Sequence, residues 1–267
     1  MRFRPALLLA ALALAGTGVA APMPAAKGLY AERFGKTSSR KVRTLIVVLH
    51  GDAPITRPSD HYAFARAAAA AVPNSIAVGL LRPGYEDARG HRSPGERGLT
   101  TGDNYTPDRI GAVAASIRSL QKRYRNARTV LVGHSGGAAI AADLAATYPG
   151  LVDGVVLVSC PCTLPEWRIH MKKVAPTPLW DQPVASLDPI KLVGGIAPGL
   201  RAAILVGMED ATTPSRFSRT YAEALTLRGI ATDFRIVPGK DHELLGDPEV
   251  MAATQRLAAS LPPRRRS

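Results

Sequence analysis

Short, continuous apolar runs alternate along this chain with longer segments whose apolar residues recur at helical spacing. The apolar runs are rich in Val, Ile and Leu, which is typical of buried strands. They lie at 44–49, 75–81, 128–132, 154–159, 202–207 and 232–237. The segments expected to be helices lie at 60–72, 108–125, 137–147, 215–229 and 248–260. This alternation predicts an α/β fold with a mostly parallel central sheet and helices on both faces, and residues 27–42 are a candidate edge strand.

Two long segments interrupt the alternation, and each follows the carboxyl end of a predicted strand. Residues 82–107 are rich in Gly, Arg and acidic residues, whereas residues 160–200 contain several prolines together with Trp167 and Trp180. Ligands of open α/β sheets bind at this end of the strands. We therefore expect 160–200, with a short helix at 165–174, to form a small cap in which both tryptophans are candidate substrate contacts. The alternative is a purely structural excursion.

The clearest chemical signal is a serine between a predicted strand and a predicted helix. The strand predicted at 128–132 stops before Gly133, and His134-Ser135-Gly136-Gly137 leads into an Ala-rich segment. A serine hydroxyl on such a tight turn is accessible to a base, and the flanking glycines let strand and helix approach closely. The N–H of Gly136, at the helix N-terminus, is placed to donate to an oxyanion. The pattern predicts that Ser135 is a nucleophile rather than part of a structural turn.

An acid and a histidine follow later strands in the order that serine catalysis on this fold requires. Asp210 comes just after the strand at 202–207, and His242 comes after the strand at 232–237. Because parallel strands present their carboxyl ends at one edge of the sheet, Ser135, Asp210 and His242 are expected to converge there. Glu209 remains the alternative acid.

These residues resemble the α/β-hydrolase superfamily, and the resemblance covers nearly the whole mature chain. The strand at 44–49 followed by His50-Gly51 resembles the start of the family core. Residues 82–85 resemble its R-P-G-Y segment, and residues 207–214 resemble its G-x-x-D-x-x-x-P segment. Within the superfamily the chain looks most similar to small secreted esterases and to dienelactone-hydrolase-like or prolyl-oligopeptidase-like catalytic domains.

The resemblance implies that the N–H of Asp52 joins that of Gly136 in an oxyanion hole. An acidic residue there is unusual, because a carboxylate aimed into the hole would repel the oxyanion. We therefore expect the Asp52 side chain to point away or to pair with Arg82 or Arg92. The N–H of Ala53 is the second candidate donor.

The resemblance also implies the reaction, which is hydrolysis of carboxylic esters through an acyl-enzyme. No cofactor and no metal are expected, and the partner is a small-molecule ester or a short peptide. A serine peptidase or amidase is the alternative function. A non-catalytic envelope-binding protein that kept the hydrolase fold is the third hypothesis. Arg82, with Arg92 and Arg97, is a candidate for binding a carboxylate of the substrate.

The ends and the charge of the chain bear on where it works. Basic residues at 2 and 4, an apolar run at 6–15 and small residues after it indicate a secretory signal peptide over 1–20. This leaves a single domain at 21–267 with a basic tail, expected to be disordered, at 262–267. The apolar run is too short for a membrane anchor, so we expect a periplasmic or extracellular protein.

The formal net charge of +13 favours anionic surfaces or acidic substrates. Aromatic residues make up only 5% of the chain and no recognition motif is visible, which argues against nucleic-acid binding. In an oxidising compartment Cys160 and Cys162 form either a local disulfide or two free thiols. The sequence does not indicate an oligomeric state.

Overall fold

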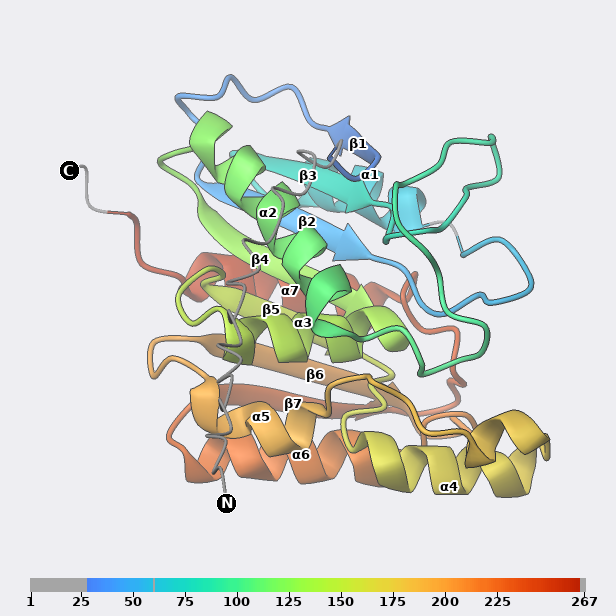
Figure 1. Ribbon diagram of the computed structural model, residues 1–267. Helices are drawn as coiled ribbons and strands as arrows, with labels where there is room; N and C mark the ends of the chain where they lie inside the picture. The colour runs from blue at the N-terminus through green and yellow to red at the C-terminus, as the bar shows by residue number, and fades with distance from the viewer. Residues whose placement is uncertain (1–27, 60, 265–267) are drawn as a thin grey trace, which may run out of the picture.

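A seven-stranded sheet forms the centre of the computed structural model, which describes residues 28–59 and 61–264 (Figure 1). The predicted signal peptide and the last residues of the basic tail lie outside the described residues. The strand order is β1-β3-β2-β4-β5-β6-β7, and β2 to β7 are all parallel. The strands are β1 Ala31–Phe34, β2 Thr44–Leu49, β3 Ser75–Leu80, β4 Arg128–His134, β5 Gly154–Val158, β6 Arg201–Gly207 and β7 Ala231–Val237.

Helices cover both faces of the sheet, so alternate residues of the central strands enter two separate cores. Helices α2 (Pro107–Arg123), α3 (Gly136–Thr147) and α6 (Ser215–Leu227) pack on one face. Helices α1 (His61–Ala71) and α7 (Pro248–Ser260) pack on the other face. This double coverage explains why the central strands are continuous apolar runs, and it confirms the predicted α/β-hydrolase architecture.

The limits of two strands can be compared directly with the predicted ranges. The candidate edge strand within 27–42 is present as β1, which is short and pairs antiparallel with β3. Strand β4 extends to His134, beyond the predicted end at 132, because His134 pairs in register with Val158 of β5. The backbone of His134, just before the candidate nucleophile, is therefore fixed by pairing within the sheet.

The 160–200 segment leaves β5 and returns to β6 as a run of short helices. These are α4 (Leu164–Val174), η1 (Pro178–Asp181), α5 (Pro189–Leu192) and η2 (Val193–Gly195). Helix α4 matches the short helix predicted at 165–174. Cys160 and Cys162, both buried, are joined by a disulfide at the start of this segment. Within the described part of the chain, no helix is both long and apolar enough to cross a membrane.

Candidate active site

Ser135 occupies a sharp turn between β4 and α3, and its backbone is in an unfavourable conformation. Its φ of 51° and ψ of −120° lie in a region that non-glycine residues rarely adopt. The surrounding structure enforces this turn, since the Ser135 N–H donates to the Val158 carbonyl at 2.8 Å. A Cβ on Gly133 would lie 2.3 Å from the Gly137 oxygen, so strand and helix touch as the sequence predicted. The turn presents the Ser135 hydroxyl at the carboxyl edge of the sheet.

The structure brings the predicted serine, histidine and acid into one hydrogen-bonded chain. His242 Nε2 lies 3.0 Å from Ser135 Oγ, and His242 Nδ1 lies 3.1 and 3.0 Å from Asp210 Oδ1 and Oδ2. In this arrangement Nδ1–H donates to the carboxylate and leaves Nε2 free to accept the serine proton. Asp210, rather than the exposed Glu209, contacts the histidine.

Asp210 is held as a carboxylate by the donors around it. Burial by itself raises the pKa of this carboxyl, but hydrogen bonds and charge from His242 and hydrogen bonds from Thr213 outweigh burial and lower the pKa to about 2. Thr213 contributes both its N–H, at 2.7 Å, and its hydroxyl, at 2.7 Å. At neutral pH Asp210 is therefore ionised and can stabilise an imidazolium at His242.

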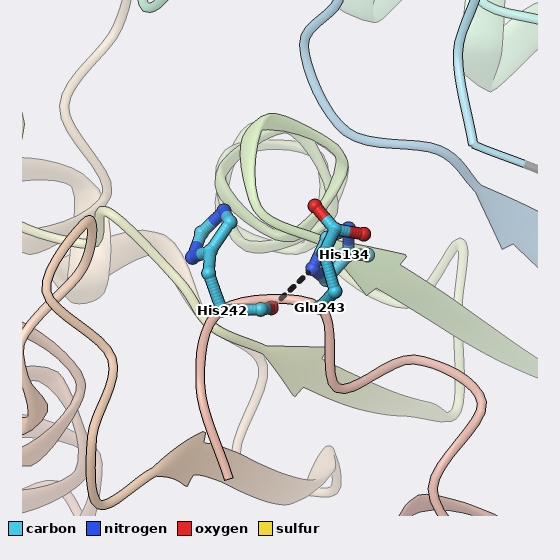
Figure 2. Close-up of side chains that lie close together, drawn as sticks. All are labelled: His134, His242 and Glu243. Carbon is cyan, nitrogen blue, oxygen red and sulfur yellow. Dashed lines mark hydrogen bonds between the residues drawn. The ribbon is translucent and has the colours of Figure 1, made fainter.

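The loop that carries His242 is fixed through its own carbonyl oxygen. His134 Nε2–H donates to the His242 carbonyl at 2.8 Å, and Figure 2 shows this bond between the two residues. The hydroxyl of Ser159, the first residue after β5, donates to the same oxygen at 3.1 Å. Strands β4 and β5 therefore both position the histidine loop, a function that the sequence analysis did not assign to either residue.

Among the residues that the structure describes, two groups of side chains have the composition of a metal site. His134, His242 and Glu243 have ligand atoms within 4.8 Å of one another (Figure 2), as do Glu32, Asp87 and His91. Both ring nitrogens of His242 already have partners, Ser135 and Asp210. We therefore attribute the first group to positioning of the histidine loop rather than to metal binding.

The Asp52 carboxylate is buried and fully paired, as its unusual location required. Its Oδ1 accepts from Arg82 Nη1 at 2.8 Å. Its Oδ2 accepts from the Gly102 N–H at 2.8 Å and from the Tyr105 hydroxyl at 2.7 Å. The Arg82 and Asp52 side chains are 0% and 2% exposed. Of the two predicted partners, Arg82 rather than Arg92 makes the pair, and Tyr105 is a third member that the sequence did not indicate.

This buried cluster adjoins the Gly136 N–H. A Cβ on Gly136 would lie 2.3 Å from Asp52 Oδ1 and 2.7 Å from the Tyr105 hydroxyl, so only glycine fits there. As the first residue of α3, Gly136 has an N–H that no helical carbonyl accepts. The Gly136 N–H is therefore placed to be one oxyanion donor, while the choice between the N–H groups of Asp52 and Ala53 as the second donor stays a prediction.

His50 completes the support of this loop as a neutral imidazole. Burial, followed by the neighbouring His61 and Arg82, lowers its pKa well below the usual value. Its Nδ1–H donates to the Gly51 carbonyl at 2.8 Å, and its Nε2 accepts from the Arg82 N–H at 3.0 Å. Arg82 therefore fixes the loop through its backbone as well as its side chain.

The three predicted substrate-binding residues differ in how far the structure buries them. The Arg82 side chain is not exposed to solvent and pairs with Asp52, so its guanidinium is not available to a substrate carboxylate. Trp167 is fully buried, and its indole N–H donates to the Thr212 carbonyl at 2.9 Å, beside the Asp210 loop. Trp180 is half-buried and packs edge-on against Trp167. These positions favour a supporting function for Arg82 and Trp167, while substrate contact by Trp180 stays a prediction.

The sheet order, the serine turn and the histidine and acid beside it define an α/β-hydrolase. The family model described as "Serine aminopeptidase, S33" matches residues 40–187, more than half of the chain. The chain therefore belongs to this α/β-hydrolase family, and it is a hydrolase of the serine type. No curated protein matches the chain.

Solved structures of several hydrolases share the fold at low sequence identity. Esterase PE8 has a TM-score of 0.62 and 18% identity, over 88% of this chain and 100% of that chain. The Paleococcus ferrophilus monoacylglycerol lipase has a TM-score of 0.58 and 19% identity, over 87% of this chain and 99% of that chain. The Pyrococcus horikoshii acylaminoacyl peptidase has a TM-score of 0.61 and 12% identity, over 87% of this chain and 39% of that chain.

Proposed function

We propose that the protein hydrolyses carboxylic esters through a Ser135–His242–Asp210 triad. The observation that carries this proposal is the continuous hydrogen-bonded chain from Ser135 Oγ through both ring nitrogens of His242 to Asp210. In the first step His242 Nε2 takes the hydroxyl proton as Ser135 Oγ attacks the ester carbonyl carbon. The N–H groups of Gly136 and Asp52 stabilise the resulting oxyanion.

The tetrahedral intermediate then collapses with loss of the alcohol, which receives the proton from His242. Water attacks the acyl-enzyme with His242 as the base, and the acid product and free serine are regenerated. Asp210 remains ionised throughout and keeps the proton of the imidazole on Nδ1. Every group needed for this cycle lies at the carboxyl edge of β2, β4, β6 and β7.

Peptide or amide hydrolysis is the second candidate. It is supported by the family description as a serine aminopeptidase and by the structural similarity to an acylaminoacyl peptidase. The same triad would serve, but the amine leaving group requires firmer protonation by His242.

Labelling with a fluorophosphonate, followed by comparison of p-nitrophenyl esters with aminoacyl p-nitroanilides, tests these proposals. Ser135→Ala should abolish labelling and ester turnover, by on the order of a millionfold, while the circular dichroism spectrum stays unchanged. Labelling that persists in this variant would rule out Ser135 as the nucleophile. Faster turnover of the anilides than of the esters would favour the peptidase.

We further propose that the protein works outside the cytoplasm. The basic, apolar and small-residue pattern of residues 1–20 supports export, and so does the Cys160–Cys162 disulfide, since such bonds persist in oxidising compartments. The intact mass of the protein recovered from the periplasm or medium is the test. A mass that still includes residues 1–20 would refute cleavage before Ala21.

A further inference from the structure

A charged pocket of about 420 Å³ lies between the loop after β2 and the long loop after β3. Figure 1 shows both loops leaving the same edge of the sheet. The residues that define the pocket for this argument are Ile55, Thr56, Arg57, Glu86, Arg92 and Arg97. Three arginines and one glutamate therefore line the pocket, which carries an excess of positive charge.

Glu86 is the carboxylate that the arginines of the pocket share. It contacts Arg92 closely and lies 3.4 Å from Arg57 Nη2. Arg97 has no carboxylate partner among the described residues, and its Nη1 donates only weakly to the carbonyls of Ala53 and Thr56, at 3.4 and 3.3 Å. One carboxylate cannot neutralise three arginines, so the pocket retains capacity for an anion.

The pocket is connected to the candidate oxyanion hole through the backbone. Ala53, whose carbonyl accepts from Arg97, directly follows Asp52. Since two residues span at most about 7 Å, the Arg97 guanidinium lies within about 10 Å of the Asp52 N–H. This spacing is short enough for a substrate whose carbonyl oxygen is held by the Asp52 N–H to extend a side arm towards Arg97.

We propose that this pocket is a subsite for a carboxylate carried by the substrate, so that the preferred substrates are anions. The inference rests on the proposed hydrolase function and adds the substrate class to it. A planar guanidinium matches a carboxylate in shape and charge, and it donates two parallel hydrogen bonds to it. The Ile55 side chain, 89% exposed, supplies an apolar surface for the chain that links the carboxylate to the ester.

Paired probes that differ only in charge test the proposal. On the acyl side, the p-nitrophenyl hemiester of glutaric acid is compared with the corresponding ester of glutaramic acid. On the alcohol side, the butyrate ester of 4-hydroxybenzoate is compared with that of 4-hydroxybenzamide. The readout is the ratio of kcat/KM for the carboxylate to kcat/KM for the carboxamide. We expect a ratio of about three to ten in one pair, because the contacts are solvent-exposed, and a smaller ratio at high salt.

Variants that are expected to change this ratio in opposite directions make the test specific. Arg97→Gln and Arg92→Gln should each lower the ratio towards one, whereas Glu86→Gln should raise it because the competing carboxylate is gone. Arg125→Gln is the matched control, since this exposed arginine follows α2 near the opposite edge of the sheet. Thermal unfolding of each variant shows that the fold is retained.

The two proposals fail in different ways. If neither member of either pair is hydrolysed and the fluorophosphonate does not label Ser135, the hydrolase function fails. If the carboxamide esters are hydrolysed but both ratios are one, or the Arg92, Arg97 and Glu86 variants leave the ratios unchanged, the subsite is refuted while the hydrolase stands.

Discussion

The buried pair between Arg82 and Asp52 makes a prediction that separates stability from catalysis. Replacing Arg82 with Met leaves the Asp52 carboxylate, 2% exposed, without its counter-ion. Removing one partner of a buried ion pair costs about 3–5 kcal/mol of unfolding free energy. The Gly102 and Tyr105 donors remain on Asp52 Oδ2, so we expect the lower end of that range.

The same substitution should slow the chemical step, because the uncompensated charge lies beside the candidate oxyanion hole. Asp52 Oδ1 lies 2.3 Å from the Cβ position of Gly136. When the distance from that position to the Gly136 nitrogen and the length of a hydrogen bond from its N–H to the oxyanion are added, the oxyanion lies at most about 8 Å from Oδ1. Two like charges at about 8 Å repel by about 2 kcal/mol at an effective dielectric constant of about 20. This repulsion corresponds to a loss of about thirtyfold in kcat.

The assay combines urea unfolding with steady-state hydrolysis of a neutral p-nitrophenyl ester at a temperature where every variant is folded. The double variant Arg82→Met, Asp52→Asn removes both charges, and it should recover at least half of both losses. Arg125→Met controls for the loss of a surface arginine. If the double variant is as slow and as unstable as Arg82→Met, charge compensation is the wrong explanation for this pair.

Further predictions follow from the groups around His242. Because the pKa of Asp210 falls from 3.8 to about 2 on folding, its ionised form stabilises the protein above about pH 4, and this contribution is lost as the pH falls through 2. The difference in unfolding free energy between the parent and Asp210→Asn should therefore shrink between pH 5 and pH 2, and a constant difference would contradict this. At pH 7 Asp210→Asn should severely reduce kcat and Glu209→Gln should not, and the reverse order would identify Glu209 as the acid. Ser159→Ala removes one of two donors to the His242 carbonyl and should lower kcat about fivefold with KM unchanged, whereas a change in KM alone would argue against positioning. Trp167→Phe should cost about 1 kcal/mol of stability and leave the acyl chain-length preference unchanged, and an altered preference at constant stability would restore it as a substrate contact.

Local patterns in the sequence determined the architecture and the candidate nucleophile. The apolar runs at 44–49 and 128–132 predicted buried parallel strands, because only a sheet covered on both faces buries every residue of such a run. The turn at Ser135 was predictable because a serine between glycines, after a strand and before a helix, has few other structural explanations. Asp210 and His242 followed from topology, since parallel strands deliver their next loops to one edge.

The surroundings of these residues were decided only by the tertiary structure. Asp52, Arg82 and Tyr105 come from three separate segments, and the sequence predicted a pair of Asp52 with Arg82 or Arg92 without choosing between them or indicating Tyr105. Arg82 was also predicted as a substrate ligand, since an arginine in a loop gives no local sign that it will be fully buried. A charged side chain is buried only where a counter-charge arrives from elsewhere in the chain, and that encounter depends on how the whole chain folds.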